Sequence, residues 1–150
     1  MNPVYVPAES PAPTAVPLRA SKRILLVDDD AAIRETHAAL LQSQGYDVEM
    51  ARDGEQALLM LAFRPFDLLV TDWHMPRFDG ASLVLWLRAA NNPIPIILHT
   101  GSTHQPIPVA IRQEVYAILA KPAPAQDLLD IAYCILNSGE DANPLMTAAA

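Results

Sequence analysis

The chain has 150 residues, of which 51% are hydrophobic and 18% are charged; this is enough for one domain with a real core and leaves no room for a second large one. Ten Lys and Arg against 17 Asp and Glu give a net charge of −7, which argues against binding to nucleic acid or to an anionic membrane surface. A single cysteine, Cys134, excludes an internal disulfide framework and a multi-cysteine zinc site, and it favours a reducing, cytoplasmic setting.

The two ends of the chain differ in composition from its middle. Residues 1–21 hold five of the 14 prolines and predict an extended, flexible Pro/Ala-rich arm, either a spacer or a docking segment for a proline-recognising partner. Residues 139–150 show little periodicity and predict a frayed, flexible tail. No signal sequence and no apolar run of about 20 residues is found, so we expect no membrane insertion. One folded domain is expected over residues 22–138.

Between these ends, short apolar runs alternate with segments of helical periodicity. In chain order, we expect a strand at residues 23–27, a helix at 31–44, a strand at 46–51, a helix at 55–63, a strand at 66–71, a helix opening at Asp79-Gly80, a strand at 94–99, a short helix near 107–113, a strand at 115–120 and a helix at 125–136. This alternation predicts an α/β protein, a doubly wound five-stranded parallel sheet with helices on both faces.

Polar residues stand where the predicted strands end: Asp28, Asp29, Asp72, Thr100 and Lys121. In parallel sheets ligands bind beyond the carboxyl ends of the strands, so these side chains are expected to converge. Clustered carboxylates repel one another unless a cation lies among them, and hard oxygen ligands favour Mg²⁺ or Ca²⁺. A lysine and a hydroxyl suit a phosphoryl group, which an aspartate can accept covalently.

With these motifs the sequence resembles the receiver domain of two-component response regulators. The resemblance covers about residues 22–138 and rests on four motifs: ILLVDDD at 24–30, TDWHMPRFDG at 71–80, HTG around Thr100 and AKP at 120–122. It implies a flavodoxin-like order of five strands and a signalling role in the cytoplasm, not an enzymatic one.

The resemblance also implies roles for the matching residues. Asp72 would be the phosphoacceptor, and Mg²⁺ would be bound by Asp28, Asp29, Asp72 and the backbone carbonyl of His74. Thr100 would turn toward the phosphoryl group on activation, and Lys121 would contact it. The bond between Lys121 and the structural Pro122 is often cis in the family.

The family further implies partners. We expect a stand-alone, single-domain response regulator, to which a sensor histidine kinase or a histidine phosphotransfer protein would deliver the phosphoryl group. Its output would be contact with a downstream target protein or a shuttle step in a phosphorelay. The main alternative is an interaction module that keeps the receiver fold and signals without phosphorylation. A third hypothesis, an Mg²⁺-dependent phosphohydrolase, is disfavoured because His74 stands where such enzymes carry a general-acid aspartate.

Three features depart from the family pattern. Ile118 occupies the place of the usual aromatic switch residue, and Tyr116 lies two residues earlier on the same strand face. His74 lies where a side chain influences the lifetime of the phosphoryl group. Two prolines after Thr100 predict that the helix near 107–113 is short and starts late.

Other side chains have a structural interpretation beside a functional one. Asp30 is expected to be a helix N-cap and not a metal ligand. His37 is expected to be a partly buried, hydrogen-bonded histidine. His99 and His104 flank Thr100, where either a packing role or titration near neutral pH is open.

The last helix carries two apolar stripes. Leu128, Ile131, Ala132 and Ile135 form the expected core face, and Leu129, Tyr133 and Leu136 form a second stripe beside it. Two interpretations of the second stripe remain open: the arm or the tail covers it, or it contacts a partner protein or a second copy in a homodimer.

Overall fold

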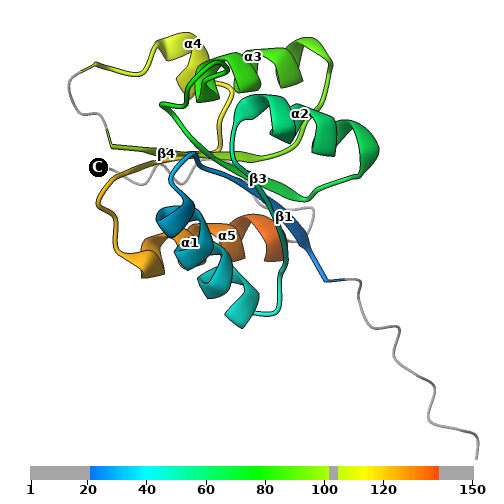
Figure 1. Cartoon of the computed structure of the whole chain (residues 1–150), viewed down its shortest axis with the longest axis vertical. Coiled ribbons are helices and arrows are strands. Elements are labelled where there is room, and N and C mark those ends of the chain that lie inside the picture. The colour runs from blue at the N-terminus through cyan, green and yellow to red at the C-terminus, as the bar shows by residue number, and fades with distance from the viewer. Residues whose placement is uncertain (1–20, 102–104, 139–150) are drawn as a thin grey trace, which may run out of the picture.

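The computed structural model describes residues 21–101 and 105–138 (Figure 1). Residues 1–20 of the expected arm, the expected tail and His104 lie outside the described residues.

Strands and helices alternate along the described chain, as predicted. Their bounds are β1 Arg23–Val27, α1 Ala31–Ser43, β2 Asp47–Ala51, α2 Gly54–Phe63, β3 Leu68–Asp72, α3 Gly80–Ala89, β4 Ile96–Thr100, α4 Val109–Arg112, β5 Ala117–Ala120 and α5 Ala125–Asn137. No helix of the described residues is long and apolar enough to cross a membrane.

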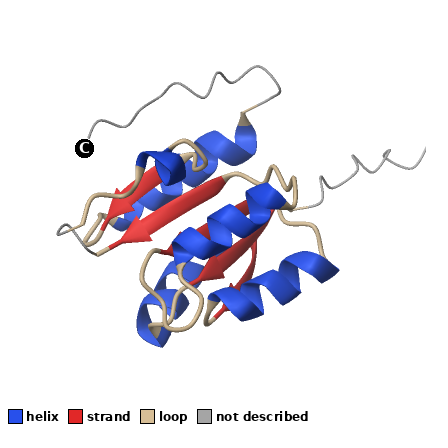
Figure 2. Cartoon of the chain, turned by 90° about the horizontal axis from the view of Figure 1, so that it is seen from above, coloured by secondary structure: helices blue, strands red, loops and turns tan. Residues whose placement is uncertain are grey.

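The strands form one parallel sheet in the order β2-β1-β3-β4-β5. Helices α1 and α5 cover one face, and α2, α3 and α4 cover the other (Figures 1 and 2). The chain reverses its direction of winding between β1 and β3, which is where doubly wound sheets bind ligands. The predicted fold class is confirmed.

Side chains of the central strands point alternately to the two faces of the sheet and contribute to the core on both. Leu25 and Leu69 pack toward α2, α3 and α4, whereas Ile24 and Leu68 pack toward α1 and α5. Strands buried on both faces read as continuous apolar runs, and this is the pattern of β1, β3 and β4. The edge strands β2 and β5 have exposed positions.

Aspartates cap the first three helices. Oδ1 of Asp30 accepts from the backbone N–H groups of Ala32 and Ile33 at 2.9 and 3.2 Å. Asp53 and Asp79 do the same for α2 and α3 at 2.8 Å each. Such caps contribute about 1 kcal/mol each to helix stability. The N-cap interpretation of Asp30 is confirmed.

The last three strands start two residues later than predicted. Ile94 is buried but lies in the loop before β4, because Pro93 and Pro95 have no N–H to donate to a strand ladder. Helix α4 is short and late, as expected: Pro108 is its N-cap and provides no side-chain hydrogen bond.

The core face of α5 differs from the predicted one. Leu128, Ala132 and Leu136 are buried, at spacings of four residues, and Ile131 and Ile135 are only partly buried. The assignment of Leu136 to an outer stripe is therefore wrong, because the contact line with the sheet follows the i, i+4, i+8 row of the helix. Leu129 also packs partly against this core, which leaves only Tyr133 of that stripe exposed.

Candidate functional site

The carboxyl ends of four strands bring the predicted polar residues to one edge of the sheet. Asp28 follows β1, Asp72 ends β3, Thr100 ends β4 and Lys121 follows β5. The parallel register aligns these ends, with Asp72 opposite His99 and Thr100 opposite Ala120. Residues up to 93 positions apart in sequence thereby meet.

Three carboxylates form the centre of the site. Asp28, Asp29 and Asp72 each place a carboxylate oxygen within 4.8 Å of the other two. Asp28 is 2% exposed and Asp72 is 7% exposed, whereas Asp29 lies in the open. Two buried carboxylates and one exposed carboxylate this close together suit a hard cation that enters from solvent.

Lys121 joins the two buried carboxylates. Its Nζ lies 3.1 Å from Oδ2 of Asp28 and 3.4 Å from Oδ1 of Asp72. Its backbone N–H donates to the carbonyl oxygen of Thr100 at 2.6 Å, and the bond to Pro122 is cis, as the resemblance implies. One ammonium among three carboxylates leaves a formal charge of −2, which matches one divalent cation.

Two donors besides Lys121 hold Asp28 in place. Its Oδ1 accepts from the backbone N–H of Asp30 at 2.9 Å, and its backbone carbonyl accepts from Nη1 of Arg34 at 2.6 Å. Arg34 lies in the first turns of α1. Nothing in the sequence distinguishes it, because an arginine on a helix is usually an ordinary surface residue. Its bond ties the backbone at Asp28 to the first turns of α1.

The pKa of Asp72 is raised from its usual value. Burial is the main cause and the charge of Asp28 adds to it, whereas the attraction and hydrogen bond of Lys121 act in the opposite direction. A raised pKa means a more basic and more nucleophilic carboxylate, provided that it is ionised. A cation bound beside it would favour the ionised form.

Two histidines lie together near the site. The rings of His37 on α1 and His99 on β4 have centroids 5.0 Å apart. His99 is 6% exposed, and burial followed by the charge of Lys121 lowers its pKa to about 4. The idea that His99 titrates near neutral pH is therefore wrong. Burial also lowers the pKa of His37.

His37 differs from its prediction in one respect. It is partly buried, as expected, but its Nδ1 has no hydrogen-bond partner within the part of the chain that the structure describes. The expectation of a hydrogen-bonded ring is not met at this atom, and the ring neighbour of His37 is the imidazole of His99.

Glycines allow the loop after Asp72 to fold back onto β3. A Cβ at Gly80 would lie far inside van der Waals contact with the Asp72 carbonyl oxygen and 3.1 Å from Cα of Trp73. The Gly80 N–H donates to the Trp73 carbonyl at 3.0 Å. A Cβ at Gly54 would lie 2.7 Å from the carbonyl oxygen of Phe78 in the same loop. Both glycines follow an N-cap aspartate. An Asp-Gly pair at the start of a helix is therefore the sequence signal by which these close approaches could be predicted.

The side chains of the two candidate switch residues are exposed to solvent. Tyr116 and Ile118 are both 36% exposed, and the intervening Ala117 belongs to the core on the opposite side. Ile118 lies in β5 opposite Leu98. Their participation in switching and the contribution of the His74 carbonyl to a metal site stay predictions.

Fold and site together define the class of protein: a doubly wound α/β domain with an acid cluster and a lysine at its switch point. A family model described as "Response regulator receiver domain" matches residues 24–133. The chain belongs to the response regulator receiver domain family. Receiver domains are signalling modules.

Solved receiver domains share this architecture. The receiver domain of Francisella response regulator 1452 superposes with a TM-score of 0.72 at 27% identity, over 77% of this chain and 96% of that one. Chemotaxis protein CheY4 of Vibrio cholerae superposes with a TM-score of 0.68 at 30% identity, over 77% of this chain and 99% of that one.

Curated relatives match by sequence over a shorter stretch. Response regulator MprA of Mycobacterium tuberculosis is 46% identical over 81 residues, which is 54% of this chain and 35% of that protein. MprA of Mycobacterium avium is 46% identical over 79 residues, 53% of this chain and 35% of that protein. The matches thus span about a third of the length of these relatives.

Proposed function

We propose that this chain accepts a phosphoryl group on Asp72 in an Mg²⁺-dependent reaction and signals through contact with another protein. The observation that carries the proposal is the cluster of Asp28, Asp29 and Asp72, whose carboxylates lie within 4.8 Å of one another. Lys121 joins the two buried members, Asp28 and Asp72. Neutralising and positioning a phosphoryl group is most of what its transfer requires.

In the proposed reaction, a carboxylate oxygen of Asp72 forms a bond to phosphorus. The P–N bond of a donor phosphohistidine breaks, and its electron pair leaves with the imidazole, which then takes a proton from solvent. Asp28, Asp29, Asp72 and the backbone carbonyl of His74 would hold Mg²⁺, which supplies positive charge for the phosphoryl oxygens. Asp29, the exposed member, lies on the side from which ion and donor enter.

Lys121 and Thr100 would respond to the new group. Nζ of Lys121 is already 3.4 Å from Oδ1 of Asp72, so a phosphoryl group there comes within reach of the ammonium. The hydroxyl of Thr100, which is buried at the end of β4, would turn toward it. Such contacts exist only in the phosphorylated state and therefore shift the equilibrium between two arrangements of the neighbouring loops.

The partners follow from this chemistry. A sensor histidine kinase or a histidine phosphotransfer protein would be the donor, and a downstream target protein would bind the switched surface. Both events place the chain in the cytoplasm, in the setting that its single cysteine also favours.

A second candidate function is a receiver-fold interaction module that does not need phosphorylation. Two observations favour it: Ile118 stands at the usual aromatic position, and α4 has only four residues, Val109–Arg112. A module of this kind would present one surface in all states.

Tryptophan fluorescence with intact-mass measurement tests the proposal. Trp73 follows Asp72 directly, so Trp86→Phe, which removes an exposed tryptophan of α3, leaves a reporter beside the site. We expect a response to Mg²⁺, then a second response to acetyl phosphate with the mass of one phosphoryl group. Asp72→Asn should lose the second response, and the exposed-acid control Asp130→Asn should keep it.

Two outcomes would contradict the proposal. A phosphoryl group that still attaches to one site of Asp72→Asn would show that the acceptor is another residue. A response to Mg²⁺ without any mass change in the parent would favour the phosphorylation-independent module.

A further inference from the structure

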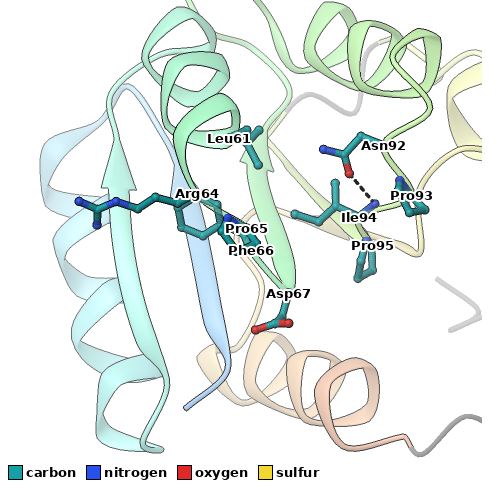
Figure 3. A pocket seen from close by; sticks show the side chains of 9 residues that line it. All are labelled: Leu61, Arg64, Pro65, Phe66, Asp67, Asn92, Pro93, Ile94 and Pro95. Carbon is teal, nitrogen blue, oxygen red and sulfur yellow. Dashed lines mark hydrogen bonds between the residues drawn. The ribbon is translucent and has the colours of Figure 1, made fainter. Parts of the chain in front are cut away.

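A cavity opens at the amino-terminal ends of the strands, whereas Asp72 lies at their carboxyl ends. The cavity has a volume of about 430 Å³ and lies between the loop that precedes β3 and the loop that precedes β4 (Figure 3). Its apolar lining consists of Leu61, Pro65, Phe66, Pro93, Ile94 and Pro95. Charged and polar groups, among them Asp67, complete the lining. The cavity is therefore lined mainly by apolar side chains, with Arg64, Asp67 and Asn92 as its polar and charged members.

The walls of the cavity are held in shape by Arg88. Its guanidinium donates to the carbonyl oxygens of Asn92 at 2.6 Å and of Ile94 at 3.0 Å, and Oδ1 of Asn92 accepts from the Ile94 N–H at 3.1 Å (Figure 3). These bonds use backbone groups that would otherwise need partners. A segment that binds here meets a preformed surface and makes mainly apolar contacts.

The chain enters the fold at the rim of this cavity. The backbone N–H of Arg23 donates to Oδ2 of Asp67 at 2.8 Å, and the Asp67 N–H donates to the Arg23 carbonyl at 2.8 Å. Asp67 is thus both a lining residue and the anchor of β1. Whatever precedes Arg23 in the chain starts beside the cavity.

We propose that residues 16–18 of this chain, Val-Pro-Leu, bind in the cavity. Pro17 lies six residues before Arg23, and an extended proline-containing segment spans about 3.1 Å per residue, so about 19 Å of chain can reach inward from the rim. Arg19, which follows the segment, has the charge that complements Asp67 at the rim.

Physical chemistry favours this occupant. Proline has its φ angle fixed before binding, so it loses little conformational entropy when it docks against apolar and aromatic walls. Attachment through the short stretch to Arg23 gives an effective concentration in the millimolar range, so a weak intrinsic affinity is enough to fill the cavity. The cavity lies away from Asp72, so the proposal does not depend on phosphorylation.

The sequence provides a matched control, because Val-Pro occurs at residues 6–7 as well as at 16–17. We would compare Val16→Ser/Pro17→Ser with Val6→Ser/Pro7→Ser in the full chain by amide NMR. The first variant should shift the amide signals of Leu61, Phe66 and Ile94, and the second should leave them unchanged. Equal shifts in both, or none in either, would overturn the proposal.

A spin label separates binding from mere proximity. The exposed Cys134 is replaced by Ser, and Ala15→Cys carries the label. We expect the label to broaden the cavity amides, and Pro93→Glu, which puts a charge at an exposed lining position, to remove most of that broadening. Broadening that Pro93→Glu leaves intact would refute docking.

A mixing experiment tests whether the contact is made within one chain. Isotope-labelled chain without the spin label is combined with spin-labelled chain without isotopes. We expect no broadening of the cavity amides in this sample. Broadening there would assign the occupant to a second copy and would contradict the proposal.

Discussion

At the scale of single residues, Lys121 compensates charge rather than binding metal. Its ammonium lies within 3.4 Å of two carboxylates that would also face the cation. We expect Lys121→Ala to retain Mg²⁺ affinity or raise it, because a competing positive charge is lost, while the response to phosphorylation disappears. Asp29→Ala should weaken Mg²⁺ binding by at least about tenfold, because it removes a ligand. Fluorescence titration of Trp73 measures both.

The comparison is decisive if both variants are folded. A loss of Mg²⁺ affinity in Lys121→Ala as large as that in Asp29→Ala would contradict the proposed division of roles. Circular dichroism supplies the check on folding.

His99 makes stability depend on pH at the same scale. Its pKa falls from 6.5 to about 4 on folding, so the unfolded chain binds the proton more readily. The stability contributed by the neutral ring is present above pH 6.5 and is lost as pH falls toward 4. Between pH 7 and pH 5 this loss amounts to about 2 kcal/mol. Urea unfolding at the two pH values measures it.

Between pH 7 and pH 5, the free energy of unfolding of His99→Leu should fall by less than that of the parent. His37, whose pKa is also lowered, is present in both proteins and largely cancels from the difference. His74→Leu removes an exposed histidine and serves as the control. Equal pH dependence of the parent and His99→Leu would show that the His99 ring is not held neutral.

At the scale of elements, the turn from β3 into α3 depends on the absence of a side chain at Gly80. A Cβ there would collide with the carbonyl oxygen of Asp72. We expect Gly80→Ala to destabilise the protein by about 1–3 kcal/mol, because backbone has to move, and to slow phosphorylation by displacing Asp72. Urea unfolding and the rate of mass change with acetyl phosphate measure the two effects.

Gly101→Ala is the matched control for this element. Its Cβ would meet Lys121 side-chain atoms at 3.7 Å, an ordinary contact, although it too adjoins the site. A change within about 0.5 kcal/mol is expected. If both variants behaved alike, the close approach at Gly80 would not be what shapes the loop.

At the scale of the whole molecule, the central strands are more deeply buried than β5 and α4. Strands β3 and β4 are buried along their full length, whereas β5 has exposed positions and α4 has one turn and no side-chain cap. We expect native-state hydrogen exchange to be slowest at amides such as Leu69 and Ile97 and clearly faster in α4 and β5. Protection of α4 equal to that of β3 would refute this expectation.

This difference in burial bears on signalling. The less buried elements α4 and β5 flank Thr100 and Lys121, the residues proposed to respond to a phosphoryl group. A weakly held element beside a site is the kind that a few new contacts can shift.

The amino-acid sequence by itself determined the elements, their parallel topology and the polar residues at the site. Apolar runs, helical periodicity and aspartate caps such as Asp30 are local signals, and parallel strands carry their carboxyl ends to a common edge. This is why the clustering of Asp28, Asp72 and Lys121 could be predicted.

Only the tertiary structure decided contacts that depend on how elements turn and pack against one another. The pairing of His37 with His99, the bond from Arg34 to the Asp28 carbonyl and the burial of Leu136 all depend on the rotation of a helix about its axis. The cavity bounded by Asp67 depends on two loops that are distant in sequence. Local patterns carry no information about such distances, because side-chain packing across the sheet sets them.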